Sequence, residues 1–493
     1  MTWKESGVPF TSDGWDLEHS GHGAVSAYLQ RMIDEIGPRR GLTLGYQINQ
    51  AFDFTALSPF LNMHLNNVGD PYTGASHLLN TRDLERSILA FFAGLWRAEP
   101  FSRSLESPWG FVLSMGATEG NMYALWNARD YVAGSPLLHM QPGTEPMREP
   151  VVFYSDQAHY SIVKCAAALA IKTFHQAGSQ RYPGRCPITD DGSWPLGVPS
   201  EDGVIDPQKL AILVDFFAQH GHPPIVVLNL GTTFHGAYDD PPAVWSTISP
   251  VLEHHGLYSP GGSRQRFWIH IDGALGAGYL PYLEMAHIQQ SGRWDGPLFD
   301  FRLPFINSLV VSSHKWFGSP VPGGIYMTKE KYRLEPPSQP EYVATPDTTL
   351  AGSRNGLSAL MLWHRLATTS KQQQADEALR CSQLADDAHA EFQQLQEKIP
   401  DFWSARSKMS LAIRFKRPGP ETFQNFGLSG QDDAAHIFVM PHVTRQAVSK
   451  LIESIRDEYR APLGRNRKAR PLPLTCPRTS GAPAFTAAKV PYT

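Results

Sequence analysis

Short apolar runs alternate with longer helix-like segments through the middle of the chain. The runs predict strands at residues 111–115, 151–155, 169–174, 225–230, 267–271, 308–312 and 324–327. Helical patterns follow several of these runs, at residues 119–132, 160–170 and 207–220. Because the runs are continuously apolar rather than alternating, they indicate a sheet buried on both faces, and the intervening helices favour parallel α/β winding. Ligands of such sheets bind beyond the carboxyl ends of the strands.

The two ends of the chain have different patterns. A long helical stretch at residues 357–399 is followed by "MSLAIRFKRP", "HIFVMPHVT" and the helical "RQAVSKLIESIRDEY", which together predict a smaller α+β domain. The first 70 or so residues look like a helical arm, and the last stretch is rich in proline and basic residues. We therefore expect an arm at 1–70, a large domain at 71–365, a small domain at 366–460 and a tail at 461–493.

The composition is that of an ordinary globular protein. The 493 residues are 42% hydrophobic and 18% charged, with a net charge of -4 and no basic stripe, which argues against a nucleic-acid partner. No segment has the roughly 18 consecutive apolar residues of a membrane span, and the start of the chain lacks the features of a signal peptide. The four cysteines are scattered and fit neither a zinc site nor a disulfide framework. We expect no metal and a cytoplasmic setting.

Polar residues stand where several predicted strands end. The stretch "VVSSHKWFGSP" at 310–320 sets His314 and Lys315 at the end of an apolar run, and Asp272 ends the run "FWIHID". His159 opens a helix after the second predicted strand, and Thr233 follows the fourth. Taken singly, each is most often a turn residue, a helix cap or a satisfied interior histidine. A buried carboxylate, however, is costly unless it meets a cation or a donor.

The first predicted strand leads into a helix through "SMGATEGNMYAL". Gly116 lets the backbone approach a ligand closely, and free N–H groups at Ala117 and Thr118 could hold an anion. The alternative is a simple capping box with Glu119. If one sheet brings all five clusters to one edge, they supply a primary amine, an acid, a flat stacking partner and an anion cradle. These are the parts that pyridoxal phosphate requires.

The chain resembles the pyridoxal phosphate-dependent group II amino-acid decarboxylases. The motifs that carry the resemblance are "SDQAHYS", "LGTT", "HIDGALGAG" and "SSHKW", in the family's order and at similar spacings. "GATEGNMYAL", "GAYDD", "LNNVGDPY" and "DTTLAGSRNG" look most like the histidine-decarboxylase-like branch. The resemblance implies a fold-type I α/β architecture: a large domain on a mainly parallel seven-stranded sheet, an N-terminal helical arm used in dimerisation and a small C-terminal α+β domain.

The resemblance also implies roles for individual residues. Lys315 would form the imine with pyridoxal phosphate, His314 would lie at the phosphate, Asp272 would pair with the ring nitrogen and His159 would stack on the ring. The other cofactor contacts that it implies are Gly116, Ala117, Thr118, Thr233, Ala274 and Ser312, with Ser353 and Arg354 contributed by the second subunit of an obligate homodimer.

Further positions concern the reaction and the substrate. The family's proton donor is a tyrosine on a mobile loop, for which Tyr342 fits the expected place better than Tyr332. Tyr46, His64 and Asn66 lie where the branch lines its substrate pocket.

The activity implied is decarboxylation of a free L-amino acid to the amine and CO2 through an external aldimine and a quinonoid. Histidine and neutral aliphatic or aromatic amino acids such as methionine, leucine or valine are the expected substrates. One alternative is decarboxylation coupled to oxidative deamination, which yields an aldehyde and which a phenylalanine in the place of Tyr342 would favour. A second alternative is an aminotransferase, which would need a C-terminal arginine for the substrate carboxylate, and Arg414 is a candidate for it. A third is a non-catalytic homologue, which the joint presence of Lys315, Asp272 and His159 disfavours.

Overall fold

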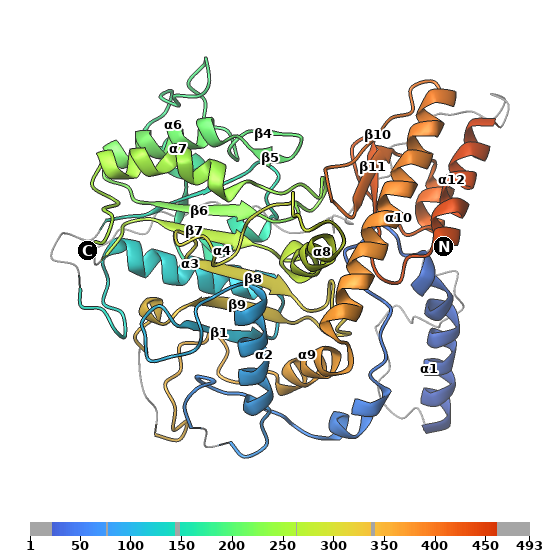
Figure 1. Ribbon diagram of the computed structural model, residues 1–493, viewed down its shortest axis with the longest axis horizontal. Helices are drawn as coiled ribbons and strands as arrows, with labels where there is room; N and C mark the ends of the chain where they lie inside the picture. Colours follow the sequence, from blue (N-terminus) through green and yellow to red (C-terminus); the bar gives the residue numbers. More distant parts are fainter. Residues whose placement is uncertain (1–21, 75–76, 143–147, 263, 337–340, 461–493) are drawn as a thin grey trace, which may run out of the picture.

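The computed structural model describes residues 22–74, 77–142, 148–262, 264–336 and 341–460 (Figure 1). The predicted tail at 461–493 and the first 21 residues of the predicted arm lie outside these described residues.

A seven-stranded sheet forms the centre of the large domain. Its strands are β1 (Pro108–Leu113), β2 (Val151–Tyr154), β3 (Lys172–Thr173), β6 (Pro224–Asn229), β7 (Trp268–Asp272), β8 (Ser308–Ser312) and β9 (Gly324–Lys329). They lie in the order β1-β9-β8-β7-β6-β2-β3, and β9 runs antiparallel to both of its neighbours. The other pairs are parallel. The predicted mainly parallel α/β sheet is confirmed.

The sheet is buried on both faces, as its continuously apolar strands predict. Every residue of β1, β2, β6, β7 and β8 is buried. Successive side chains of a strand point to opposite faces. On β7, Ile269 and Ile271 therefore pack on one face, whereas Trp268 packs on the other with residues of α3. Asp272 shares the face of Trp268, which brings its carboxylate to the α3 side of the sheet.

Helices cover the two faces. On one face α3 (Ala117–Ala133) contacts the strands from β6 to β9, with α4 (Ser161–Ala168) beside it. The other face packs against α2 (Arg82–Leu95), α5 (Phe174–Arg181), α6 (Pro207–Gln219), α7 (Pro241–His254) and α8 (Gly276–Ser291). Two short elements lie outside these layers, the hairpin β4 (Ser200–Glu201) with β5 (Val204–Ile205) and the 3-10 turn η4 (Glu330–Tyr332).

Two predicted elements differ from the observed ones. The strand expected at 169–174 shrinks to β3, because Thr173 already forms a capping box with Gln176 and so begins α5. The long helix expected at 357–399 is two helices, α9 (Gly356–Thr368) and α10 (Lys371–Lys398). Ser370 forms a capping box with Gln373 and starts the second of them.

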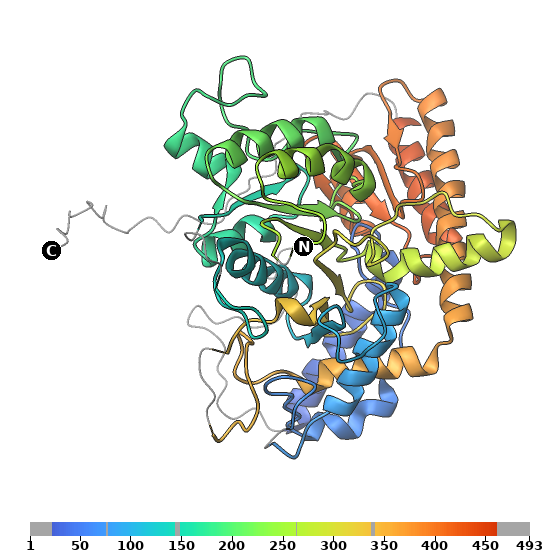
Figure 2. The same cartoon turned by 60° about the vertical axis from the view of Figure 1, so that its left-hand side comes forward.

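The C-terminal region has its own four-stranded antiparallel sheet. Its strands are β10 (Ser404–Ala405), β11 (Ala412–Lys416), β12 (Ser429–Gln431) and β13 (Ala434–Phe438), in the order β10-β11-β13-β12. Helices α11 (Pro420–Asn425) and α12 (Arg445–Arg460) accompany it. Helix α10 contacts both α8 and α12 and so joins this region to the large domain (Figures 1 and 2).

The N-terminal segment crosses from the small domain to the edge of the large sheet. It contains α1 (His22–Ile36) and the 3-10 helices η2 (Gly37–Leu42) and η3 (Thr55–Asn62). Between them the backbone N–H of Leu44 donates to Phe426 at 3.0 Å, and the N–H of Phe438 donates to the carbonyl of Leu44 at 2.8 Å. Three residues after Leu44, the side chain of Gln47 contacts the amine of Lys315.

None of the helices in the described ranges is both long and apolar enough to cross a bilayer. Cys165, Cys186 and Cys381 are buried free thiols. Within the same ranges, no group of three or more histidine, cysteine or carboxylate side chains is arranged to hold a metal.

Candidate active site

The carboxyl ends of β1, β2, β6, β7 and β8 meet around one pocket of about 270 Å³. The predicted residues that line it are Ala117, Thr118, His159, Thr233, Asp272, Ala274, Ser312, His314 and Lys315. The expectation that separate strand-end clusters share one edge of the sheet is confirmed.

Lys315 follows β8 and places its amine inside this pocket. Burial lowers the pKa of the amine from 10.5 to about 8, and the carboxylate of Asp272 opposes that shift. The Nζ atom donates to Oε1 of Gln47 at 2.5 Å. Near neutral pH a lysine of this kind carries far more of the unprotonated, nucleophilic amine than an exposed one.

Asp272 ends β7 and presents a carboxylate held by neutral donors. The backbone N–H of Ala274 donates to Oδ1 at 3.2 Å, and Nδ2 of Asn121 donates to Oδ2 at 2.8 Å. Because neither donor carries a charge, the negative charge stays available to a cationic group of a ligand.

His159 lies between β2 and α4. Its Nδ1 accepts from the backbone N–H of Ser161 at 3.3 Å and lies 2.8 Å from the Ser161 hydroxyl. Burial lowers the pKa of the imidazole, and the nearby Asp272 opposes the shift. A neutral, flat ring at the pocket wall suits stacking on a planar ligand.

The motif around Gly116 was expected to be either an anion site or a simple helix cap with Glu119, and the turn from β1 into α3 has features of both. Oε2 of Glu119 accepts from the N–H groups of Ser114 and Met115 at 2.7 and 2.8 Å and so fixes the turn. The start of α3 nevertheless lines the pocket through Ala117 and Thr118. Helix N-termini attract anions because their first N–H groups have no partners within the helix.

Gly116 is required at this turn for two reasons. Its φ angle is +70°, and a Cβ atom would lie 2.6 Å from Cε1 of His314. Burial lowers the pKa of His314 to about 4, with a further contribution from Lys315, so the ring is neutral. The Ser312 hydroxyl accepts from the N–H of Ala117 at 3.0 Å, which ties the start of α3 to the end of β8.

The two threonines after β6 have different surroundings. Thr232 is buried, and its hydroxyl accepts from the N–H of Ala237 at 3.1 Å, so it is the turn residue. Thr233 is exposed and lines the pocket. Both threonines line the pocket, and the hydroxyl of Thr232 is already engaged by the turn.

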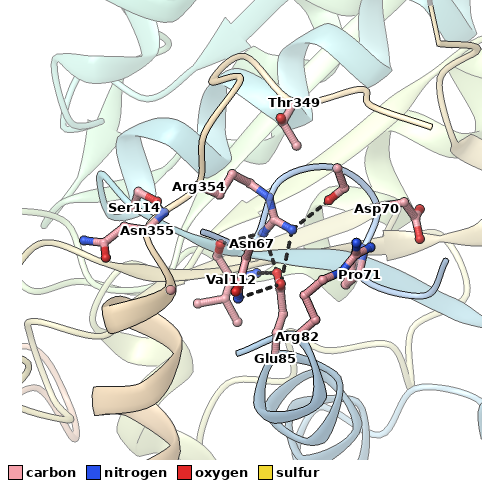
Figure 3. Close-up of polar contacts among 12 residues, drawn as sticks. Asn67, Asp70, Pro71, Arg82, Glu85, Val112, Ser114, Thr349, Arg354 and Asn355 are labelled. Atoms are coloured by element: carbon pink, nitrogen blue, oxygen red, sulfur yellow. Dashed lines mark hydrogen bonds and ion pairs between the residues drawn. The ribbon is translucent and has the colours of Figure 1, made fainter. Parts of the chain in front are cut away.

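Arg354 lies outside this pocket, in a buried cluster of its own (Figure 3). Its guanidinium forms an ion pair with Glu85, and Nη2 also donates to the carbonyl of Gly69 at 2.7 Å. The neighbouring Ser353 is exposed, and its hydroxyl accepts from Nδ2 of Asn66 at 3.1 Å. Within one chain, the arginine serves the fold and the serine faces outward.

The three predicted substrate-pocket residues also lie apart from this pocket. Tyr46 and His64 are exposed, and His64 meets His77 edge to face with 6.1 Å between ring centroids. Asn66 binds Ser353 and the backbone N–H of Arg354. None of the three lines the pocket formed by the described residues.

The two candidate tyrosines are in opposite situations. Tyr332 is buried, and its hydroxyl accepts from Nδ2 of Asn307 at 2.9 Å, beyond the amino end of β8. That is the far edge of the sheet from Lys315, so Tyr332 does not reach the pocket. Tyr342 is 83% exposed and does not line the pocket of its own chain.

The sequence interpretation missed three residues around Lys315 and Asp272. Asn121 lies one helical turn after Ala117, and His270 lies two residues before Asp272 on the same strand face, so spacing could have identified both. Gln47 is 268 residues from Lys315, and no local pattern links them.

The groups of the pocket fit pyridoxal phosphate. Lys315 offers an amine for the aldehyde, Asp272 a carboxylate for a protonated ring nitrogen and His159 a flat partner for the ring. Gly116 leaves space where a side chain would collide with His314. The N–H of Ala117, expected to be free, already donates to Ser312, so a phosphate there would meet the N-terminus of α3 at Thr118 together with the Ser312 hydroxyl.

Comparisons with known proteins agree with this chemistry. The pyridoxal-dependent decarboxylase conserved domain matches residues 80–397. The chain is 29% identical over 450 residues to histidine decarboxylase from Pseudomonas entomophila strain L48, covering 90% of this chain and 94% of the relative. It is 28% identical over 437 residues to serine decarboxylase 2 from Oryza sativa subsp. japonica, covering 88% and 78%.

Among solved structures, the chain is similar to L-methionine decarboxylase from Streptomyces sp.590 in its internal aldimine form. The identity is 38% and the TM-score is 0.82, with 91% of this chain and 96% of that chain covered. A glutamate decarboxylase from Lactobacillus brevis shares the fold with a TM-score of 0.63 at 14% identity.

Proposed function

This chain belongs to the pyridoxal-dependent decarboxylase family, and we propose that it decarboxylates a free L-amino acid with a neutral side chain, methionine being the first candidate. Leucine, valine and other neutral amino acids follow, and histidine is the remaining expectation. The enzyme is an amino-acid decarboxylase, a carboxy-lyase, and its cofactor is pyridoxal phosphate.

The observation that carries the proposal is one pocket holding both a buried amine and a carboxylate whose hydrogen-bond donors are neutral. Lys315 has a lowered pKa and Asp272 accepts only from neutral groups in the described chain. Bound pyridoxal phosphate supplies an electron sink for the electron pair that remains when the carboxyl group leaves as CO2.

The surrounding residues have complementary roles in this proposal. The amine of Lys315 attaches the cofactor, and the carboxylate of Asp272 keeps the ring nitrogen protonated. His159 packs against the ring. The start of α3, with Thr118, Ser312 and His314, holds the phosphate. These groups position the cofactor and restrict its orientation, which is the main contribution of the protein to such reactions.

The lining of the pocket supports a neutral substrate. Apart from Asp272 and Lys315, which the proposal assigns to the cofactor, the side chains that line it in the described chain are neutral, and burial lowers the pKa of both histidines among them. A charged substrate side chain would need an opposite charge to offset its loss of hydration. The solved relative at 38% identity is named as an L-methionine decarboxylase, which favours methionine as the first substrate to test.

We also propose that the working enzyme is a homodimer, with Tyr342 as the proton donor in the pocket of the partner. Helix α1 exposes Val25, Leu29, Met32, Ile33 and Ile36, which recur at helical spacing on one face. Exposed apolar stripes of this kind often mark protein interfaces. Tyr342 and Ser353 are both exposed, as residues that serve a second subunit should be. The cytoplasmic location stays a prediction.

Incubation of the holoenzyme with each of the twenty amino acids tests the function. We expect CO2 and the corresponding amine in equal amounts, from methionine or another neutral amino acid. Aldehyde and ammonia in proportion to CO2 would replace the proposal with oxidative deamination. Absence of every product, together with no cofactor absorbance in the wild-type protein, would contradict it.

A further inference from the structure

We infer that Asn121 and His270 are positioning residues that lock the carboxylate of Asp272 in one orientation toward the cofactor. The inference rests on the proposed role of Asp272. A continuous chain of hydrogen bonds runs behind this carboxylate, from Asp272 through Asn121 and His270 to Ser308 and Trp268. We call these five residues the relay.

The relay is fully internal. The exposed fractions are 6% for Asp272, 1% for Asn121 and 0% for His270, Ser308 and Trp268. Its contacts are short: 2.8 Å from Asn121 Nδ2 to Asp272 Oδ2, 2.9 Å from His270 Nε2 to Asn121 Oδ1, and 2.8 Å from His270 Nδ1 to the Ser308 hydroxyl. Asp272 and Asn121 line the pocket, and His270, Ser308 and Trp268 lie behind them.

The two ends of the relay determine the direction of every hydrogen bond in it. At one end the carboxylate of Asp272 can only accept, so Asn121 must turn its amide nitrogen toward it and its oxygen toward His270. At the other end the indole of Trp268 can only donate, at 3.0 Å to the Ser308 oxygen. The Ser308 proton is then free for Nδ1 of His270, whose own proton must lie on Nε2.

The imidazole in the middle stays neutral. Burial lowers the pKa of His270 to about 4, although Asp272 opposes that shift. A neutral ring with its proton on Nε2 donates to Asn121 and accepts from Ser308, as both neighbours require. If the Asn121 amide were flipped, its oxygen would face the carboxylate of Asp272 and its NH2 group would face the Nε2–H of His270. Both contacts would be repulsive, so the relay excludes that orientation.

Placing an amide between the acid and the imidazole has a chemical consequence. An imidazole in direct contact with a carboxylate tends to become protonated and to pair with its charge. Here Asn121 separates the two groups, and it neither gives up nor takes a proton at ordinary pH. Asp272 therefore receives a hydrogen bond without losing negative charge, and that charge remains for the ring nitrogen.

Asn127 provides a matched control on the same helix. It is 2% exposed, and its amide donates to the carbonyl of Tyr332 at 2.5 Å and accepts from the Tyr326 hydroxyl at 3.2 Å. These contacts do not involve the pocket. Asn121→Leu and Asn127→Leu make the same chemical change at equally buried positions, one in the relay and one outside it.

The test measures the dissociation constant for pyridoxal phosphate and the visible absorbance of the bound cofactor, using holoenzyme dialysed against graded cofactor concentrations. We expect Asn121→Leu to weaken cofactor binding about 10- to 100-fold, the scale of losing an outer partner of a site ligand. The visible band should shift. His270→Phe should weaken binding less, and the double variant no more than Asn121→Leu alone, because both act through one amide. Asn127→Leu should leave affinity and spectrum unchanged.

Three results would overturn the inference. They are additive effects of Asn121→Leu and His270→Phe, equal effects of Asn121→Leu and Asn127→Leu, or an unchanged spectrum in Asn121→Leu. Asn121→Ser, which cannot span both contacts at once, replaces the leucine variant if that one does not fold. The variant Asp272→Asn separates failure of the proposed function from failure of this inference. If Asp272→Asn binds the cofactor normally, the proposed role of Asp272 is wrong. If Asp272→Asn binds it poorly and Asn121→Leu binds it normally, only the role of the relay is wrong.

Discussion

The pocket and the Arg354–Glu85 cluster are both buried polar regions of the large domain, but their charges have different partners. In the cluster, the guanidinium of Arg354 meets the carboxylate of Glu85, which also accepts from Asn67 and from the backbone N–H of Val112 (Figure 3). In the pocket, Lys315 donates to a neutral amide and Asp272 accepts from neutral donors.

The pKa values of the two buried cations move in opposite directions. Burial alone would lower both. The pKa of Lys315 falls to about 8 because Asp272 only partly compensates. Although burial disfavours its charge too, the pKa of Arg354 is raised because Glu85 outweighs that effect. A buried charge that its own chain compensates in full holds the fold together, and one that is compensated only in part is ready for a ligand.

Of all the variants, Lys315→Ala should have the largest effect, and it should act on the pocket rather than on the fold. We expect decarboxylation to fall by roughly 10⁴-fold or more, the scale of losing a covalent catalytic group. The absorbance of the imine between Lys315 and the cofactor should disappear as well. The free energy of urea unfolding of the cofactor-free protein should not decrease, because the variant removes a poorly solvated amine. A large loss of stability would mean that the fold depends on Lys315.

Arg354→Met should have the reverse effect. Removing one partner leaves the carboxylate of Glu85 buried and unpaired, which costs about 3–5 kcal/mol of unfolding free energy. Urea unfolding at one fixed protein concentration measures this. Cofactor affinity should change little in the fraction that stays folded.

A double variant sharpens the same test. Arg354→Met with Glu85→Leu replaces the ion pair by apolar groups and should recover much of the lost stability. Unchanged stability in Arg354→Met combined with weak cofactor binding would instead make Arg354 a phosphate ligand, as the family resemblance implies.

Arg354 also marks a limit of prediction from sequence. The strands, their burial and the gathering of Lys315, Asp272 and His159 were predictable, because apolar runs and polar strand ends are local patterns. The partner of Arg354 was not, because Glu85 is 269 residues away and nothing in "AGSRNG" identifies it. The same holds for Gln47 at Lys315, whereas Asn121 and His270 share a helix or strand face with predicted residues and could have been found.

Tyr342→Phe tests whether an exposed residue completes the pocket. Losing a positioned acid typically costs 10²- to 10⁴-fold, and we expect amine formation to fall by about 10²-fold. In air-saturated buffer, aldehyde should rise as a share of the product, since the carbanion formed on loss of CO2 then persists long enough for dissolved O2 to take two electrons from it and form peroxide. Amine and aldehyde measured in one incubation decide this. Equal rates of amine formation in the variant and the wild type would remove Tyr342 from the site.

The protonation of Lys315 predicts a pH dependence. The neutral amine attacks an aldehyde, so cofactor uptake by the cofactor-free protein should accelerate as pH rises through about 8 and then level off. Because Asp272 opposes the lowering of this pKa, Asp272→Asn should move the midpoint to lower pH. Stopped-flow absorbance at a series of pH values measures both midpoints. A midpoint near 10.5, the ordinary value, would mean that the amine is solvated.

Tyr332→Phe should have the smallest effect and is the natural counterpart of Tyr342→Phe. The Tyr332 hydroxyl accepts from Asn307 and lies in a buried aromatic cluster with Tyr131 and Trp268. Removing one such hydrogen bond costs about 1 kcal/mol, somewhat more if the Asn307 amide is left without an acceptor. The ratio of amine to aldehyde should not change, because this hydroxyl lies at the opposite edge of the sheet from Lys315. A change in the ratio of amine to aldehyde would show that the Tyr332 hydroxyl influences the reaction. A buried group that is paired within the chain would then not serve the fold alone.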